Sequence, residues 1–153
     1  MTTTAHTLPA AIRLSCAQYA DRAAIIDGDY RATYAQLLPQ IEQAASALIA
    51  LGVQAGDRVA VWAPNVYEWI IAACGTHMAG AVLVPINTRM KGMEANDILE
   101  RSGCKVLFSI GDFLGSYYPD MLAEGRPACL AHTIVLRQAP KNAGELSWEG
   151  FLA

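Results

Sequence analysis

The stretch "RVAVWAPNVYEWIIAACGTHMAGAVLVPI", residues 58–86, decides the fold of this chain. It begins with a continuous apolar run, "RVAVWA", which is typical of strands buried on both faces of a parallel sheet. Pro64 ends this run, and a mainly apolar segment then continues at helical length as far as Gly80. The run "AVLVPI" that follows predicts a second buried strand. Strand, helix and strand in this order predict two parallel strands joined by a right-handed crossover.

The chain after this stretch repeats the same order. "KGMEANDILERS", residues 91–102, predicts a helix that ends at Gly103, and "KVLFSI", residues 105–110, predicts a third parallel strand. Further on, "PDMLAEG" (119–125) predicts a short helix and "HTIVLR" (132–137) a last strand. "APKNAG" is typical of a loop, and "SWEGFLA" of the start of a helix.

The chain before this stretch predicts a helix and a hairpin. "TLPAAIRLSCAQYADR", residues 7–22, is expected to form a short helix with one apolar face. That face is formed by Ile12, Cys16 and Tyr19. "AAIIDGDYRATY", residues 23–34, predicts a β-hairpin that turns at Asp27 and Gly28.

Capping patterns mark the starts of two helices. Thr33 precedes Gln36 by three residues, so each side chain can accept a hydrogen bond from the backbone of the other. The helix that begins there is predicted to end at Gly52. Its buried face is predicted to carry Leu37, Leu38, Ile41, Ala45, Leu48 and Ile49. Asn65 and Glu68 predict the same kind of cap for the next helix.

These elements together predict an α/β fold: a three-layer parallel-sheet subdomain built from consecutive strand–helix–strand units and preceded by a helix and a β-hairpin. The composition indicates that this subdomain is an incomplete part of a larger domain. Apolar residues make up 54% of the chain and charged residues only 16%, although a small domain needs proportionally more polar surface than a large one. We therefore expect apolar surface that another part of a larger protein would cover.

Charge and cysteine content argue against several classes of protein. The net charge is −3 and no run of like charges occurs, which argues against nucleic-acid binding. The four cysteines, at positions 16, 74, 104 and 129, show neither CxxC nor zinc spacing, so we expect reduced thiols. The start of the chain lacks the pattern of a secretory signal, and the apolar region 69–84 is too short to span a bilayer. A soluble, cytoplasmic protein without a transmembrane segment is expected.

Polar side chains directly follow two of the predicted strands, as "APN" at 63–65 and as "PINTR" at 85–89. In open parallel sheets ligands bind beyond the carboxyl ends of the strands, so these segments are expected to border a ligand cleft. The planar guanidinium of Arg89 is suited to bind a phosphate or a carboxylate there. The alternative is a surface ion pair between Arg89 and an acid such as Glu94. The residues expected to cap or brace these turns are Asn65 and Asn87.

Three sharper interpretations are outweighed by structural ones. Cys74 and His77 lie three residues apart on one predicted helix, as a nucleophilic thiolate–imidazole pair would, but no third residue is visible to orient the histidine. The carboxylates of "DGD" at 27–29 are more typical of a turn than of a metal site. Four residues are expected to pack in the core and not to form a ligand pocket: Trp62, Tyr67, Trp69 and Met78. We therefore predict no catalytic and no metal-binding residue in this chain.

The segment "GDRVAVWAPNVYEWIIAACGTHMAGAVLVPINTRMKGMEANDILERSGCKVLF", residues 56–108, resembles the amino-terminal part of the adenylate-forming acyl-CoA synthetases. This superfamily of AMP-dependent synthetases and ligases also contains the luciferases. The shared pattern is a G-D-R-V strand, a P-N turn, a helix ending in A-G-A, a P-x-N-x-R strand end and an S-G-x-K-V-L strand. With the opening hairpin and helix, the resemblance covers residues 9–137. The segment "EANDILERSGCKVLFSIGDFLGSYYPDML" is similar to bacterial fatty-acid CoA ligases and to ligases for short acid side chains on steroid-derived rings.

The resemblance implies a ligase of fatty-acid or lipid metabolism that works in two steps. A carboxylate attacks the α-phosphate of ATP to give an acyl-adenylate and pyrophosphate, and the thiol of coenzyme A then displaces AMP. The family uses Mg²⁺ and a loop of the form S/T-G-T-T-G-x-P-K, which this chain does not contain. "GTHMAG", residues 75–80, imitates a phosphate loop, but it lacks the lysine and lies at the end of a helix, where the dipole repels anions.

The resemblance therefore implies that residues 1–153 are the amino-terminal portion of an AMP-dependent synthetase/ligase domain, without its phosphate-loop core and its carboxy-terminal domain. It places Arg89 near the nucleotide phosphates of coenzyme A. The complete enzyme would use ATP, Mg²⁺, coenzyme A and a carboxylic acid, whereas none of the cofactors is expected to bind tightly to this chain alone. The chain alone is expected to be inactive. The alternative is a non-catalytic α/β module from the same family that binds or interacts with a partner.

Overall fold

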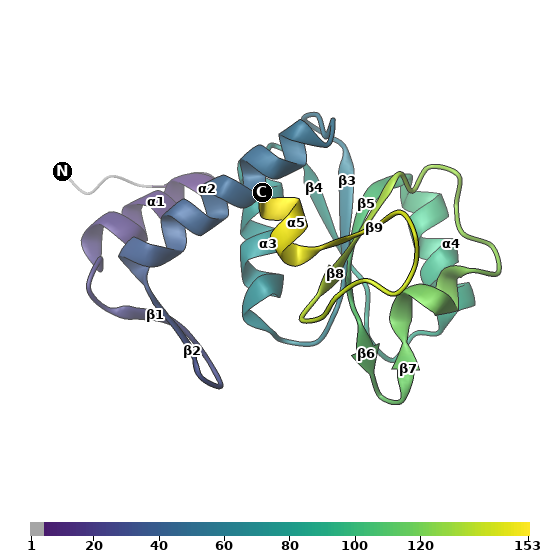
Figure 1. Cartoon of the computed structure of the whole chain (residues 1–153). Coiled ribbons are helices and arrows are strands. Elements are labelled where there is room, and N and C mark those ends of the chain that lie inside the picture. Colours follow the sequence, from purple (N-terminus) through teal and green to yellow (C-terminus); the bar gives the residue numbers. More distant parts are fainter. Residues whose placement is uncertain (1–4) are drawn as a thin grey trace.

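A parallel sheet of five strands lies at the centre of the computed structural model, which describes residues 5–153 (Figure 1). The strands are β3 (Arg58–Trp62), β4 (Val82–Pro85), β5 (Cys104–Ile110), β8 (His132–Leu136) and β9 (Glu145–Ser147). Their order in the sheet is β4-β3-β5-β8-β9, and every neighbouring pair is parallel. The predicted parallel sheet is confirmed, and β9 is a strand that the sequence pattern did not predict.

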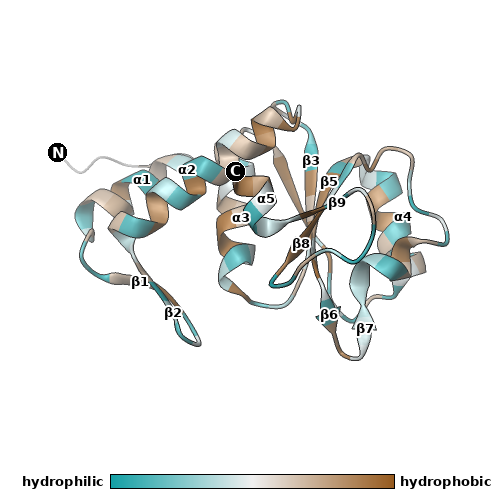
Figure 2. Cartoon of the chain, viewed as in Figure 1, coloured by the Kyte–Doolittle hydropathy of each residue, from teal (hydrophilic) through white to brown (hydrophobic). Residues whose placement is uncertain are grey.

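The two central strands explain the continuous apolar runs in the sequence. β3 pairs with β4 on one side and β5 on the other, and each of its residues from Val59 to Trp62 is 0% exposed. Helices cover both faces of these strands, so neither face alternates with polar residues; Figure 2 shows the central strands as largely hydrophobic. The prediction that the run "AVLVPI" is buried is wrong in part. β4 is the edge strand, and Val82 is 49% exposed there because no further strand within residues 5–153 pairs with that edge.

Helices on both faces of the sheet make three layers (Figure 1). The chain passes from β3 through α3 (Tyr67–Met78) to the edge strand β4, then through α4 (Gly92–Ser102) back past β3 to β5. Because these crossovers run in opposite directions across the sheet, crossovers of one hand place α3 and α4 on opposite faces. α2 (Tyr34–Ala50) packs against α3, and α5 (Trp148–Leu152) packs against α2 and β8. The predicted three-layer α/β architecture is confirmed.

The close approach of α2 and α3 depends on Gly75. A Cβ atom on Gly75 would lie 2.9 Å from the Cβ of Ala44, closer than real Cβ atoms approach. Gly80 follows α3 in a left-handed conformation, with φ +75°, which glycine adopts without strain. The glycines of the "GTHMAG" segment therefore serve helix packing and helix termination, as expected for a segment that only imitates a phosphate loop.

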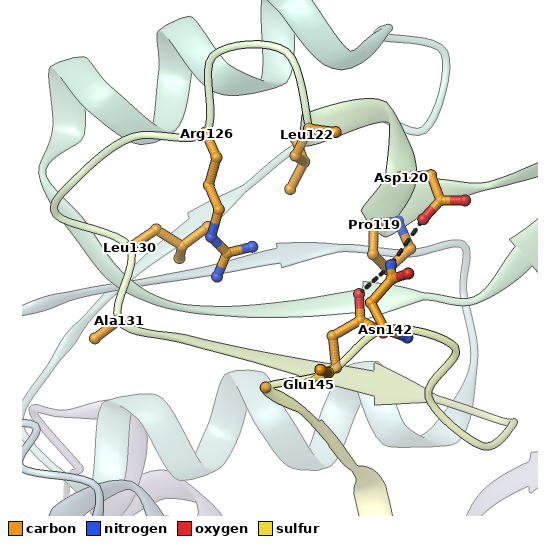
Figure 3. A pocket seen from close by; sticks show the side chains of 11 residues that line it. Pro119, Asp120, Leu122, Arg126, Leu130, Ala131, Asn142 and Glu145 are labelled. Atoms are coloured by element: carbon orange, nitrogen blue, oxygen red, sulfur yellow. Dashed lines mark hydrogen bonds between the residues drawn. The ribbon is translucent and has the colours of Figure 1, made fainter.

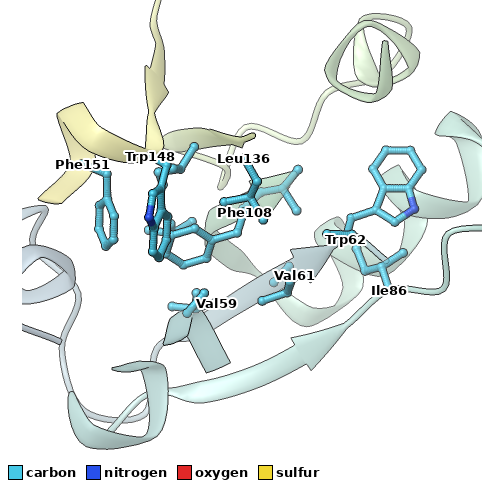
Figure 4. Close-up of a cluster of buried hydrophobic side chains, with 14 of the residues drawn as sticks. Val59, Val61, Trp62, Ile86, Phe108, Leu136, Trp148 and Phe151 are labelled. Atoms are coloured by element: carbon cyan, nitrogen blue, oxygen red, sulfur yellow. The ribbon is translucent and has the colours of Figure 1, made fainter. Parts of the chain in front are cut away.

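Aromatic rings fill the core between the sheet and α5. Phe108 on β5 meets Trp148 and Phe151 of α5, with ring centroids 6.0 and 5.1 Å apart respectively. Both contacts are edge-to-face, the favoured geometry for aromatic pairs, and Figure 4 shows the three rings grouped together. The short helix predicted from "SWEGFLA" thus closes the core at this end of the sheet.

The predicted amino-terminal elements are present as α1 (Leu8–Gln18), β1 (Ala23–Asp27) and β2 (Tyr30–Thr33). The capping box of α2 is confirmed: the Thr33 N–H donates to the Gln36 side chain at 2.9 Å, and the Gln36 N–H donates to the Thr33 hydroxyl at 3.3 Å. Two predicted face residues are misplaced. Tyr19 follows the end of α1 and is 37% exposed, and Ile49 is 57% exposed because it lies one residue beyond the buried stripe that ends at Leu48.

The start of α3 differs from the predicted cap. Val66, and not Asn65, is the N-cap, and no side chain of its own segment caps the helix. A carboxylate oxygen of Asp27, at the hairpin turn, accepts the hydrogen bond from the Tyr67 N–H at 2.9 Å. Glu68 points inward and is only 2% exposed. The predicted pairing of Asn65 with Glu68 is wrong because a residue 40 positions away already occupies the end of the helix.

The segment between β5 and β8 is more structured than the sequence predicts. It contains a small hairpin, β6 (Asp112–Phe113) and β7 (Ser116–Tyr117), followed by a 3-10 helix, η1 (Tyr118–Leu122). The helix predicted at 119–125 therefore forms, but it is shorter, tighter and begins one residue earlier.

Large apolar side chains remain exposed on the described part of the chain. They are Leu8, Leu14, Tyr19, Ile26, Ile49, Ile70, Val82, Met93 and Leu114. This exposure agrees with the apolar composition and with a subdomain that belongs to a larger fold. No helix within residues 5–153 is long and apolar enough to cross a membrane. The expected absence of a secretory signal falls partly on residues 1–4, which lie outside the described residues.

Candidate functional site

A cleft of about 490 Å³ opens at the carboxyl ends of β3 and β4. Its walls are formed by Ala63, Pro64, Asn65, Trp69, Pro85, Ile86, Asn87 and Thr88. The two segments that the sequence places after these strands, 63–65 and 85–89, therefore do meet at one edge of the sheet. This is the edge at which ligands bind in open parallel sheets.

Two aromatic side chains bind the backbone of the segment after β4, which forms one wall of the cleft. The indole N–H of Trp62 donates to the backbone carbonyl of Asn87 at 3.1 Å, and the hydroxyl of Tyr118 donates to the carbonyl of Thr88 at 2.7 Å. The Asn87 side-chain oxygen accepts from the Arg89 N–H at 2.9 Å, which closes a local turn. The prediction that Asn87 braces its turn is confirmed, and the backbone at this wall is fixed by bonds to the core.

Arg89 lies at the rim, one residue beyond the lining of the cleft. Its side chain is exposed and makes no hydrogen bond or ion pair with any residue in the range 5–153. The Glu94 carboxylate, the partner considered in the surface alternative, accepts from the Lys91 N–H at 2.8 Å at the start of α4. The surface ion pair is therefore absent from the described residues, and all five donors of the guanidinium face solvent or a ligand.

The opposite wall begins with Asn65, for which no side-chain hydrogen bond occurs in the described part of the chain. Asn65 and Trp69 also border a second hollow of about 400 Å³ between α3 and β1. Exposed apolar residues line that hollow, including Ile26 at 59% and Ile70 at 39% exposure. The cleft, whose polar groups are Asn65, Asn87 and Thr88, thus adjoins an apolar hollow along the amino-terminal hairpin.

An ion network beside this wall was missed by sequence reasoning. Arg137, directly after β8, donates from Nε to the Glu68 carboxylate at 3.1 Å and from Nη2 to the Asp27 carboxylate. The Arg137 guanidinium also lies over the ring of Tyr67, 5.5 Å from its centroid. Burial raises the pKa of the Tyr67 hydroxyl to about 12, and the neighbouring Glu68 charge adds to the shift. In the sequence, the acidic residues at 27 and 29 are typical of a simple turn and do not indicate that Asp27 binds Arg137.

A further pocket of about 430 Å³ lies between η1 and the loop before β9 (Figure 3). The side chain of Arg126 points into it and donates to the Thr133 hydroxyl at 3.0 Å. On the facing wall, Asn142 bridges the carboxylates of Asp120 and Glu145 at 2.7 and 2.9 Å. The polar groups on that wall are satisfied by one another, so the pocket offers a weaker site than the cleft.

The sharper chemical interpretations find little support in the geometry. Burial raises the pKa of the Cys74 thiol, which disfavours the thiolate, and no hydrogen bond joins Cys74 to His77 in the described chain. Trp62 is 0% exposed and Tyr67 is partly buried against the core, as predicted, although Trp69 also lines the cleft. No group of three or more acidic, histidine or cysteine side chains is placed to hold a metal ion within residues 5–153.

Comparison with known proteins agrees with this geometry. The AMP-binding enzyme family matches residues 12–151. A Mycobacterium tuberculosis protein named 3-[(3aS,4S,7aS)-7a-methyl-1,5-dioxo-octahydro-1H-inden-4-yl]propanoyl:CoA ligase is 41% identical over 148 residues, which are 97% of this chain and 29% of that protein. The human mitochondrial medium-chain acyl-CoA ligase ACSF2 is 35% identical over 100 residues, which are 65% of this chain and 16% of that protein.

Solved structures show the same fold. The anthranilate CoA ligase AuaEII in complex with anthranoyl-AMP matches with a TM-score of 0.86 and 26% identity over 96% of this chain and 28% of its own. The apo structure of Mycobacterium smegmatis MbtA matches with a TM-score of 0.84 and 30% identity over 96% of this chain and 27% of its own. The chain thus spans less than a third of the length of these relatives. With its matched residues running through every strand of the central sheet, the chain belongs to the AMP-binding enzyme family.

Proposed function

We propose that this chain forms one wall of the active site of an ATP-dependent acid:CoA ligase, as the amino-terminal portion of its AMP-binding domain. The observation that carries the proposal is the cleft between Asn65 and Asn87, at the ligand-binding edge of the sheet, with Arg89 unpaired at its rim. The complete enzyme would convert a carboxylic acid and ATP to an acyl-adenylate, and then transfer the acyl group to coenzyme A.

The role proposed for Arg89 is to bind the nucleotide phosphates of coenzyme A. A guanidinium without an acidic partner among the described residues has its donors available for a phosphate, and its planar fork suits two oxygens at once. The turn closed by the Asn87 side chain fixes the backbone from which Arg89 projects. The order of the two steps predicts that Arg89 contributes to the second step only.

The chain by itself is proposed to be inactive. Stabilising the charge that develops on the α-phosphate requires cations or backbone donors placed around it, and the cleft offers neutral amides and one rim arginine. The purified chain with ATP, Mg²⁺ and an acid should therefore release no pyrophosphate above background. Pyrophosphate release by the chain alone would overturn this part of the proposal.

A chimera tests the ligase function directly. In the M. tuberculosis relative, the segment that matches over 148 residues would be replaced by this chain. Thioester formation would then be measured with ATP, coenzyme A and the carboxylic acid for which that relative is named. An active chimera supports the proposed function. A chimera that folds but forms neither adenylate nor thioester would contradict it and favour the non-catalytic module.

Within an active chimera, Arg89→Ala should raise the KM for coenzyme A by about tenfold, as expected for the loss of one charge-assisted contact. Adenylate formation, measured as pyrophosphate exchange without coenzyme A, should change by less than about twofold. Arg101→Ala is the matched control, because Arg101 is an exposed arginine on α4 that, within residues 5–153, pairs with Asp97 alone. An equal loss in both steps would rule out a role in coenzyme A binding.

A further inference from the structure

The backbone conformation of Arg137 is unusual and ties it to its surroundings. Arg137 has φ +65°, a left-handed conformation that is uncommon for a residue with a side chain. It is the first residue after β8, at the same carboxyl edge of the sheet as the cleft. Such a conformation persists when other interactions hold it, so the contacts of its side chain indicate why it is there.

Those contacts join three separate segments of the chain. Nε of Arg137 binds Glu68 in the first turn of α3, and Nη2 binds Asp27 at the end of β1. The same Asp27 oxygen accepts the hydrogen bond from the Tyr67 N–H at 2.9 Å. The Glu68 side chain is 3% exposed, so its charge depends on Arg137 for compensation. One guanidinium thus fixes the hairpin and the start of α3 to the end of β8.

Stacked rings reinforce the same junction. Tyr67 lies parallel to Tyr30 of β2, with ring centroids 3.8 Å apart and an interplanar angle of 9°. The Arg137 guanidinium covers Tyr67 at 5.5 Å. Tyr67 is therefore held by its backbone N–H and by its ring, and it lies midway between the two cleft residues Asn65 and Trp69 in the sequence.

We propose that Arg137 is a positioning residue for the cleft: through Glu68 and Asp27 it fixes the start of α3 and so sets the position of the Asn65–Trp69 wall. The opposite wall, after β4, is held independently by Trp62 and Tyr118. The width of the cleft then depends on Arg137 on one side and on the aromatic core on the other. The proposal rests on the proposed function only in taking the cleft as the ligand site, because its geometry is independent of any reaction.

The test measures the two walls separately by NMR of the 153-residue chain. Arg137→Gly removes the guanidinium while leaving a residue that adopts the left-handed conformation without strain. We expect the Tyr67 amide to exchange with solvent at least about tenfold faster and the Asn65 side-chain amide signal to shift. The Asn87 side-chain signal should stay in place, and amides of β5 should change by less than about twofold.

Three further variants keep the test decisive if Arg137→Gly fails to fold. Asp27→Asn keeps an oxygen for the Tyr67 N–H but removes the charge that binds Arg137, so exchange at Tyr67 should rise with the fold intact. Asp29→Asn, at the exposed carboxylate on the other side of Gly28 in the hairpin turn, is the control and should change neither wall. Arg137→Lys keeps a charge that reaches one acid at a time and should give intermediate exchange.

Two results would overturn the proposal. One is that Tyr67 and β5 amides speed up equally in Arg137→Gly, which would make Arg137 a contributor to overall stability without a local role. The other is that Asp27→Asn matches Asp29→Asn at Tyr67 and at the Asn65 side chain. Either result would leave the ligase chimera unaffected, and an inactive chimera would leave these NMR shifts unaffected, so the two proposals fail separately.

Discussion

Replacing Trp62 by phenylalanine tests how the cleft is joined to the core. Trp62 is 0% exposed, packs against Tyr118 with ring centroids 4.6 Å apart, and donates its indole N–H to the Asn87 carbonyl at 3.1 Å. The substitution keeps an aromatic ring but removes roughly 40 Å³ of side chain, which costs about 1 kcal/mol at the usual cavity penalty. Losing the hydrogen bond costs about 1 kcal/mol more.

The expected loss in the free energy of unfolding is therefore about 2 kcal/mol, or a drop of about 6 °C in Tm for a chain of this size. Urea unfolding followed by circular dichroism measures it as a lower midpoint with an unchanged slope. The substitution should also raise the solvent-exchange rate of the Arg89 amide, in the turn that Trp62 supports, by a larger factor than the exchange rates of the β8 amides. This second readout separates the loss of the bond from a general loss of packing.

Trp69→Phe is the matched control. Trp69 lines the cleft, is only partly buried, and its indole N–H makes no hydrogen bond within residues 5–153. Its loss should cost less than about 1 kcal/mol. If Trp62→Phe cost no more than Trp69→Phe, or if the Arg89 amide kept its protection, then the indole bond would not hold the cleft wall and the argument for a rigid site would fail.

Three other predictions follow from local geometry. Gly92→Ala should lower the free energy of unfolding by about 3 kcal/mol or more in urea, because the new Cβ atom would lie 1.7 Å from a backbone oxygen of η1. The control is Gly144→Ala, which should cost only about 1 kcal/mol because Gly144 has φ +84° and open space around it. Burial and a hydrogen bond to a neighbouring carboxylate raise the pKa of Tyr117 to about 12. The contribution of Tyr117 to stability is therefore complete below its unfolded pKa of about 10 and is lost as pH rises toward 12. Tyr117→Phe should reduce the decrease in the free energy of unfolding between about pH 10 and 12, and an unchanged decrease would contradict the assignment. Burial raises the pKa of the Cys74 thiol, so iodoacetamide at neutral pH should label exposed Cys129 first, and faster labelling of Cys74 would revive a nucleophilic role.

The central crossovers were predictable because local rules act in the same direction there. The apolar run from Arg58 to Trp62 is too short for a helix and too continuous for a half-exposed strand, and glycines end both following helices. β9 escaped prediction because its three residues are too few to show a period, and their strand pairing depends on β8. β9 forms because its backbone lies beside β8, and a local sequence pattern carries no information about that pairing.

From the sequence, only the part of the site that directly follows the carboxyl ends of the strands could be predicted. The segment from Pro85 to Arg89 could be placed at the cleft because parallel strands present their carboxyl ends at one edge. The contacts at the start of α3 could not be predicted, because Asp27 and Arg137 reach it from 40 and 69 positions away in the sequence. Sequence reasoning chose Asn65 as the cap by proximity, whereas the folded chain uses a carboxylate that only tertiary packing brings near.

The exposed edge of the sheet gives the strongest physical reason to regard the cleft as incomplete. Within residues 5–153, β4 is an edge strand of four residues that carries Pro85 but no charged residue to discourage pairing with another strand. Val82 is 49% exposed on it, and the strand ends at Pro85 on the wall of the cleft. A strand added parallel to β4 would bury this edge and bring its own carboxyl end next to Asn87. The same addition that covers the apolar edge would therefore extend the site, so one added strand would both bury Val82 and lengthen the wall of the cleft.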